Sequence, residues 1–182
     1  MVAEKYTIDQ PLTKKQVKEL EVKISEGDLH SMAIFTYDAL KFHLNDTKLL
    51  EYRKWLVIRA DHQGNRSILR NVASLAAYTN DIDMTDFLIP LFYEINDFSS
   101  PFYISNILRN SSNPASIACG NLYLQKVAKC GHFAAKSMLY RDKTKRWGVL
   151  GYIGWLGYMV FIGLRMVPVL ILNKNDPRIL IK

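Results

Sequence analysis

The sequence is poor in acidic side chains toward its C-terminus. Residues 1–130 carry 15 basic and 15 acidic side chains, whereas residues 131–182 carry nine basic and two acidic ones, so the whole net charge of +7 lies in the second range. The neutral larger part has no basic stripe along which a nucleic acid could release counterions. We therefore expect no nucleic-acid partner.

The sequence also lacks the common signatures of catalysis. It contains no glycine-rich phosphate loop and no nucleophile elbow. Three carboxylates crowd residues 80–86, but helix-start positions explain Asp81 and Asp83, and the glycine of a calcium loop is missing. Cys130 and His132 lie close together without the further ligands that zinc needs or the third group that nucleophilic catalysis needs.

These absences favour a non-enzymatic protein without metal or cofactor. The two cysteines are expected to be reduced. A hydrolase that uses Cys130 and His132 is the least favoured alternative.

An export signal is not apparent near the N-terminus, but a long apolar stretch is present near the C-terminus. From Trp147 to Leu172 the one charged residue is Arg165, which either ends the membrane span or lies within it. The uninterrupted residues 147–164 would form a helix of about 27 Å, close to the hydrocarbon thickness of a bilayer. The basic cluster RDKTKR (141–146) precedes the stretch, and Trp147 and Trp155 supply interfacial rings.

We predict a single-pass membrane protein from this pattern. More basic residues precede the apolar stretch than follow it, which places the N-terminal domain in the cytoplasm, with a bacterial inner membrane as the expected location. The alternative is a core helix of a soluble protein.

Glycine recurs at every third position of the apolar stretch, and these glycines would form a shallow groove on one side of the helix. Such a groove lets another helix, including one of a second copy of this chain, approach closely. These residues are Gly148, Gly151, Gly154 and Gly157.

Apolar periodicity and capping residues predict eight helices before this stretch, and no segment alternates with the period of a strand. Thr13 with Gln16 fits a capping box, and Asn113 with Pro114 fits a helix start. Pro90 should kink its helix or delay its start. The expected helices cover residues 13–25, 28–44, 47–61, 65–79, 82–96, 101–109, 114–130 and 132–141.

Turns recur between these helices at similar intervals. Gly27, Gly64 and Gly131 each follow a helical run, and Ser100-Pro101 takes the same place between the fifth and sixth helices. Their separations of 37, 36 and 31 residues are typical of helical repeats. A glycine just past a helix end adopts the left-handed conformation at low cost, so we predict αα-hairpins stacked into a solenoid.

Three segments resemble Sel1-like repeats, a branch of the tetratricopeptide-like solenoids. Gly120 with the following Leu-Tyr pair resembles the family's Leu-Gly-x-Leu-Tyr, and Ala128 occupies the small-residue position before Gly131. The resemblance covers roughly residues 23–140 but lacks the family's Tyr-x-x-Gly-x-Gly-Val loop. It implies an adaptor or binding scaffold, and some bacterial members neutralise toxic effectors. The segments are Ile58–Tyr78, Ala115–Tyr123 and Lys126–Leu139.

The predicted organisation is an N-terminal arm (1–12), a helical-repeat domain (13–141), a basic juxtamembrane segment with a transmembrane helix (142–172) and a short tail (173–182). A solenoid presents a concave surface lined by the helix that follows each corner. Side chains on these helices that lie off the apolar stripe are the candidates for binding a protein. They are Tyr37, Lys41, Arg66, Arg70, Tyr103 and Asn106.

We therefore expect a membrane-anchored helical-repeat protein with a protein partner, in contact with membrane lipid. The partner would be a toxin or effector that the chain neutralises, or a subunit of an envelope or secretion complex. The alternative is a structural membrane subunit that assembles through its glycine-rich helix.

Overall fold

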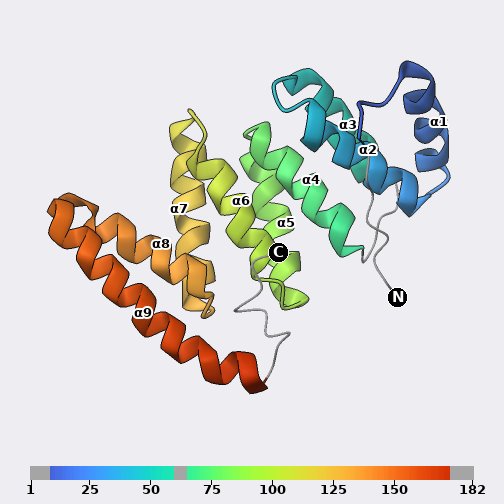
Figure 1. Ribbon diagram of the computed structural model, residues 1–182. Coiled ribbons are helices and arrows are strands. Elements are labelled where there is room, and N and C mark those ends of the chain that lie inside the picture. The colour runs from blue at the N-terminus through green and yellow to red at the C-terminus, as the bar shows by residue number, and fades with distance from the viewer. Residues whose placement is uncertain (1–8, 60–64, 173–182) are drawn as a thin grey trace. The chain divides into compact units, whose positions relative to one another are not determined.

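The computed structural model describes residues 9–59 and 65–172, and every regular element in these ranges is helical. The all-α prediction is thereby confirmed for the described residues. Figure 1 shows the helices in chain order, with a short 3₁₀ helix, η1, before the last one. Their bounds are α1 Lys14–Ser25, α2 Leu29–Phe42, α3 Thr47–Arg59, α4 Arg66–Tyr78, α5 Ile82–Glu94, α6 Ser99–Arg109, α7 Pro114–Lys129, α8 Phe133–Thr144, η1 Lys145–Trp147 and α9 Gly148–Leu172.

Helix ends follow the local signals that the sequence shows. Thr13 caps α1 in a complete capping box, in which Gln16 Oε1 accepts the Thr13 N–H at 2.9 Å. The Asn113 side chain accepts the Ala115 N–H at the start of α7, and Pro114 is the first helical residue. Most predicted bounds agree with the structure to within about two residues, and α8 continues to Thr144, beyond the predicted end at 141.

Four helix ends share one backbone turn. At each, a residue past the helix adopts a left-handed φ, and the next residue donates its N–H to the carbonyl five positions earlier, as in a Schellman motif. The side chain of that second residue then accepts an N–H at the start of the following helix. The pairs are Gly27-Asp28, Asn80-Asp81, Asn96-Asp97 and Gly131-His132.

Two of the predicted corners are confirmed, and one differs. Gly27 and Gly131 have φ of 84° and 97°, as expected of glycine corners. The turn between α5 and α6 uses Asn96 (φ 53°), because Asn tolerates this conformation, and Ser100-Pro101 lies inside the first turn of α6. The predicted corner at Gly64 falls outside the described residues.

The chain divides into two compact units, Met1–Ile89 and Pro90–Lys182, with the boundary inside α5. Pro90 lacks the N–H that a helix interior normally uses, yet α5 begins at Ile82 and continues to Glu94. The predicted delay of the helix start therefore does not occur.

In the first unit, α2 contacts α1, α3 and α4. Helices α2 and α4, two apart in sequence, lie side by side (Figure 1), as stacked αα-hairpins require. Buried Ala39, Leu50 and Leu75 form a core cluster at the junction of these helices, with Leu40, Leu49 and Tyr78 packed around it.

A buried ion pair lies where the residues just before α1 meet α2 and α3. The Arg53 guanidinium donates to Asp38 Oδ2 at 2.5 Å and to the Phe35 carbonyl at 2.7 Å, and both charged side chains are almost fully buried. The other carboxylate oxygen of Asp38 accepts the Leu12 N–H at 2.9 Å. Asp38 thus connects the segment before α1 with α2 and α3.

In the second unit, each helix from α6 to α9 packs on the next. Helices α6 and α7 approach each other closely at Gly120, where an added Cβ would lie 2.8 Å from the Ser105 carbonyl oxygen and 2.9 Å from the Arg109 backbone nitrogen. Leu124, Val127, Ala128 and Ala135 form the buried cluster between α7 and α8. The small residues at 120 and 128, which contribute to the family resemblance, are therefore both packing positions.

Candidate functional site

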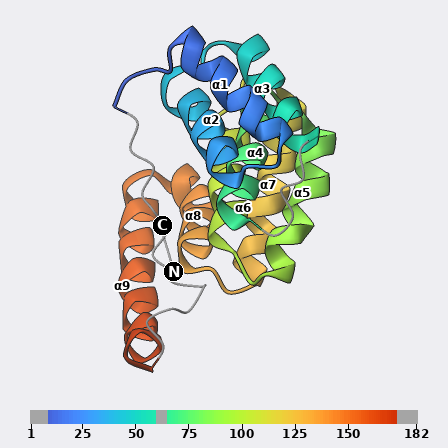
Figure 2. The same ribbon diagram turned by 90° about the vertical axis from the view of Figure 1, so that its right-hand side faces the viewer.

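The last two helices form an antiparallel hairpin, and its turn depends on a glycine. Helix α8 ends at Thr144, η1 follows, and Gly148 then adopts φ 57° and ψ −129°, a backbone region essentially restricted to glycine. Figures 1 and 2 show α9 running back beside α8. The basic cluster RDKTKR (141–146) therefore lies at the end of α8 and the start of the turn.

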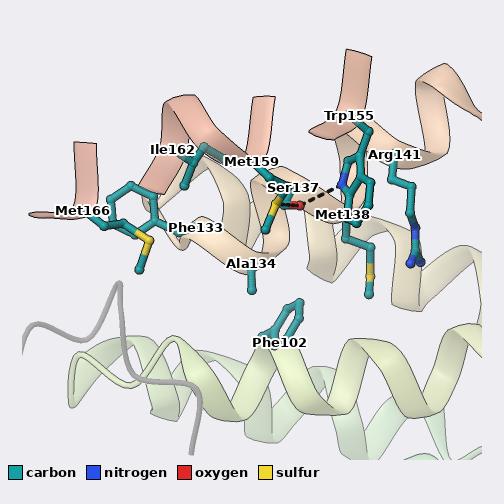
Figure 3. A pocket seen from close by; sticks show the side chains of 10 residues that line it. All are labelled: Phe102, Phe133, Ala134, Ser137, Met138, Arg141, Trp155, Met159, Ile162 and Met166. Carbon is teal, nitrogen blue, oxygen red and sulfur yellow. Dashed lines mark hydrogen bonds between the residues drawn. The ribbon is translucent and has the colours of Figure 1, made fainter. Parts of the chain in front are cut away.

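Aromatic and polar side chains join the two helices along their length. The rings of Tyr140 and Tyr158 stack with centroids 4.3 Å apart. Trp155 Nε1 donates to Ser137 Oγ at 3.0 Å, and Ser137 Oγ contacts Met159 Sδ (Figure 3). Each of these pairs joins α8 to α9, so the hairpin has a defined register.

The outer face of α9 is apolar and exposed. The described part of the chain holds one helical stretch long and apolar enough to cross a membrane, within Phe133–Pro168, and 11% of its most apolar window is buried. A core helix of a soluble protein would be mostly buried, so the low buried fraction favours the membrane interpretation. The large exposed apolar residues of α9 are Val149, Leu150, Tyr152, Ile153, Leu156, Met159, Val160, Phe161, Leu164 and Val167.

The predicted groove glycines do not share one environment. Gly148 belongs to the turn, and Gly151 packs so tightly on α8 that an added Cβ would lie 1.9 Å from the Thr144 carbonyl oxygen. A Cβ on Gly154 would meet the Tyr140 hydroxyl at 3.7 Å, an ordinary contact, and a Cβ on Gly157 would meet open space. Two of the four glycines thus act within the hairpin, and Gly157 remains available to a second helix.

The predicted aromatic and charged residues of this segment also lie in different environments. Trp147 is exposed in the turn, with the Arg146 guanidinium 5.8 Å from its ring centroid. Trp155 faces α8, as the hydrogen bond to Ser137 shows. Arg165 is exposed on α9, with its guanidinium 4.7 Å from the centroid of Phe161, and α9 continues beyond it to Leu172.

The predicted protein-binding residues lie on the three expected helices. Tyr37 and Lys41 are one turn apart on α2, with the Lys41 ammonium 5.7 Å from the Tyr37 ring centroid. Arg66 and Arg70 are one turn apart on α4, which packs against α2. These four candidates thus come from adjacent helices of one unit, whereas Tyr103 and Asn106 lie on α6 in the other unit.

The candidate catalytic and metal-binding groups have structural roles. His132 is buried, its Nδ1 accepts the Ala135 N–H at 3.3 Å to cap α8, and its ring lies 4.7 Å from that of Phe102. Asp81 Oδ1 accepts the Met84 N–H at 3.1 Å to cap α5. Among the described residues, no group of three or more metal-ligating side chains is gathered.

Tyr93 is a partly buried neighbour of this region that packs against the cluster between α7 and α8. Its hydroxyl is buried and makes no hydrogen bond with any described residue, and burial, reinforced by the charge of the nearby Cys130, raises the pKa of Tyr93 to about 12. The phenol is therefore neutral at physiological pH. Cys130 itself is exposed at the end of α7.

The structure also reveals a cavity between α8 and α9 that sequence analysis missed. It has a volume of about 220 Å³, and Phe102 of α6 forms its floor (Figure 3). A second cavity of about 370 Å³ adjoins it at the hairpin turn and shares Arg141 and Trp155 with it. The clustered aromatic and Met residues at 155–166 are the sequence signal, but they become a site only when α9 folds back on α8.

Comparison with protein-family models, with curated proteins and with solved structures found no match to this chain.

Proposed function

We propose that this chain is a membrane-anchored, non-enzymatic helical-repeat protein that binds another protein. Helix α9 provides the anchor, and the stacked helix pairs provide the binding surface. The observation that carries the proposal is the apolar outer face of α9, which leaves a long helix exposed where a soluble protein would bury it.

The anchor fits the chemistry of a bilayer boundary. Apolar side chains cover α9 from Val149 to Val167, and the basic cluster at residues 141–146 adjoins its first turn. Basic residues beside a membrane helix favour the cytoplasmic side and its anionic lipids. We propose on this basis that the N-terminal helices lie in the cytoplasm, and a bacterial inner membrane stays a prediction.

Membrane fractionation tests the anchor. Leu156 and Val160 are exposed on α9, so the double variant Leu156→Lys, Val160→Lys should fold while losing about 2.5 to 3.5 kcal/mol of membrane insertion free energy per lysine near the bilayer centre. Leu122→Lys, which adds one lysine on the exposed face of α7, is the control outside the anchor. The wild type and the control should remain in membranes after alkaline carbonate extraction, and the double variant should become soluble.

Two other results would change the interpretation. If alkaline carbonate releases the wild type from membranes although it binds vesicles at neutral pH, α9 lies on the membrane surface and does not span it. A wild type that stays in the supernatant under both conditions would refute the anchor.

The binding function rests on the arrangement of α2 and α4 and on the resemblance to Sel1-like repeats. Tyr37, Arg66 and Arg70 lie on the adjacent helices α2 and α4 and are of the two residue types, Tyr and Arg, that are enriched in protein interfaces, and Lys41 lies beside Tyr37. Within the described residues, Cys130 and His132 occupy a helix end and a cap, which supports a non-enzymatic role.

Site-specific photo-crosslinking in cells tests this surface. A crosslinker at Tyr37 or Arg70 should give one discrete adduct, whereas a crosslinker at Lys15, whose side chain is 89% exposed on α1, should not. An adduct partner that kills cells lacking this chain identifies a neutraliser, and a partner that belongs to an envelope complex identifies an adaptor. Equal labelling from Lys15 would refute the proposed surface.

A further inference from the structure

We propose that the two adjoining cavities of the α8–α9 hairpin form a single binding site for one anionic phospholipid, with an acyl chain in the apolar cavity and the phosphate headgroup at the basic turn. That a membrane supplies this lipid rests on the proposed function. The binding of the lipid depends only on the residues of the hairpin and of the floor of the cavity.

The first cavity suits an acyl chain because its walls are apolar on three sides. Phe133 and Met138 come from α8, Met159 and Ile162 from α9, and Phe102 from α6. The one hydroxyl in the lining, on Ser137, already contacts Trp155 and Met159 across the hairpin. A polar ligand would therefore find few free partners in this cavity, and a flexible hydrocarbon fits walls rich in Met.

The second cavity supplies the opposite chemistry. Arg141 stands at one end of the apolar cavity in Figure 3 and also lines the cavity at the turn, together with Lys145. Neither side chain forms an ion pair with any described residue. The acidic residue of this cavity, Asp142, forms an ion pair with Arg109, in which Arg109 Nη2 lies 2.5 Å from Asp142 Oδ2. Two cations are thus available to a phosphate where the apolar cavity ends.

An apolar cavity that adjoins two cations favours a membrane phospholipid over other apolar ligands. A peptide side chain would use the apolar cavity but not the two cations, and a soluble phosphate would use the cations but leave the apolar cavity empty. An anionic phospholipid satisfies both cavities at once. Its position is also consistent with the bilayer, because the basic turn lies at the end of α9 where headgroups are expected.

Tryptophan quenching provides a direct readout. The chain has three tryptophans, so the full-length variant Trp55→Phe, Trp147→Phe leaves Trp155 as the sole fluorophore, at the junction of the two cavities. The protein is held in mild detergent micelles and titrated with phosphatidylglycerol or phosphatidylcholine, each carrying brominated acyl chains. We expect phosphatidylglycerol to quench Trp155 at a much lower lipid fraction than phosphatidylcholine does.

Three variants on this background test the parts of the site. Arg141→Gln with Lys145→Gln should weaken the phosphatidylglycerol response about 25-fold, at about fivefold for each basic residue removed. Lys143→Gln removes one positive charge from α8 outside both cavities and should leave the response nearly unchanged, whereas each charge removed inside the second cavity should cost about fivefold. Ala134→Leu fills the apolar cavity and should weaken the response while preserving the fold, as judged by circular dichroism.

The outcomes separate this site from the membrane anchor. Equal quenching by the two lipids, or a loss of about fivefold in the Lys143→Gln control, would overturn the site, because either result would come from general contact with hydrocarbon or from overall charge. An unchanged response in Ala134→Leu would overturn the placement of the chain. Lipid-selective quenching by a protein that fails to stay in membranes would retain the site and refute the anchor.

Discussion

Gly151 of α9 lies against the main chain of Thr144, so close that a Cβ built on the glycine would be 1.9 Å from the Thr144 carbonyl oxygen. This contact fixes α9 to the end of α8, one turn after Gly148 reverses the chain. It also shows that a glycine in an apolar helix can serve the fold of its own chain.

We predict that Gly151→Ala opens the hairpin, whereas Gly157→Ala does not. The first substitution forces a clash with backbone, which we expect to cost about 1 to 3 kcal/mol. The second places a methyl group in open space and gains helix propensity of about 1 kcal/mol. Thermal unfolding of the full chain in detergent, followed by circular dichroism, should show a lower midpoint for the first variant alone.

The same pair of positions distinguishes folding from assembly. Leucine at Gly157 should reduce any self-association through α9 without lowering the unfolding midpoint, because its Cβ meets nothing within 4 Å. A lower midpoint for both alanine variants would contradict the assignment of these glycines.

We next predict that Gly120→Ala destabilises the α6–α7 contact. Its new methyl group would lie 2.8 Å from the Ser105 carbonyl oxygen, and backbone can move only by shifting the helix, so we expect a loss of about 1 to 3 kcal/mol. Gln125→Ala, exposed on the same helix, should stay within about 0.5 kcal/mol of the wild type. Urea unfolding curves for both variants provide the test, and similar losses would refute the packing role.

The helix boundaries could be predicted because their signals are local. Thr13 and Asn113 carry cap side chains, and Gly27 and Gly131 end helices, so each boundary depends on residues within one turn. The corner at Asn96-Asp97 was not predicted, because the nearby Ser100-Pro101 also has the residue types of a helix start. The repeated Asn-Asp pair was the available signal, at positions 80–81 and 96–97, where Asn supplies the left-handed turn and Asp the cap.

The site could not be predicted because it depends on contacts between distant residues. Glycines at every third position suggested an outward groove, but the positive φ of Gly148 turns α9 back onto α8 and directs Gly151 inward. Phe102 lies more than fifty positions from Trp155 in the sequence and still lines the same cavity. No periodicity within one helix contains that information.

A double-mutant cycle should measure the buried ion pair of the first unit. Arg53→Met leaves the Asp38 carboxylate buried without its arginine partner and with His43 Nε2 at 3.5 Å, which should cost about 3 to 5 kcal/mol of unfolding free energy at a pH where His43 is neutral. Adding Asp38→Asn removes the orphan charge but keeps an oxygen for the Leu12 N–H, so the double variant should recover part of that loss.

The control for this cycle is a pair on the surface. Lys15 and Glu19 lie 4.0 Å apart on α1 with side chains 89% and 60% exposed, so Lys15→Met should change the unfolding free energy by less than about 1 kcal/mol. If the double variant were as unstable as Arg53→Met alone, the loss would come from the arginine's packing, and the charge would not be responsible.

The dependence of the unfolding free energy on pH should report a second ion pair, formed by Lys54 and Asp81. Burial alone would raise the pKa of Asp81, but the hydrogen bonds from Lys54 and the Met84 N–H, together with the Lys54 charge, hold this pKa below the ordinary value of 3.8. On acidification the unfolded chain therefore takes up this proton first. The stabilisation is present above the unfolded pKa and is lost as the pH falls through the folded pKa.

Asp81→Asn should therefore be less stable than the wild type at neutral pH, because the charge attraction to Lys54 is gone while the amide oxygen still caps α5. The difference in unfolding free energy between the two proteins should shrink as the pH is lowered from about 6 to about 3, as measured by urea unfolding. Asp83→Asn, exposed in the first turn of α5, serves as the control and should leave the slope of stability against pH close to that of the wild type. A difference between Asp81→Asn and the wild type that stays constant over this range would show that Asp81 acts through its cap alone.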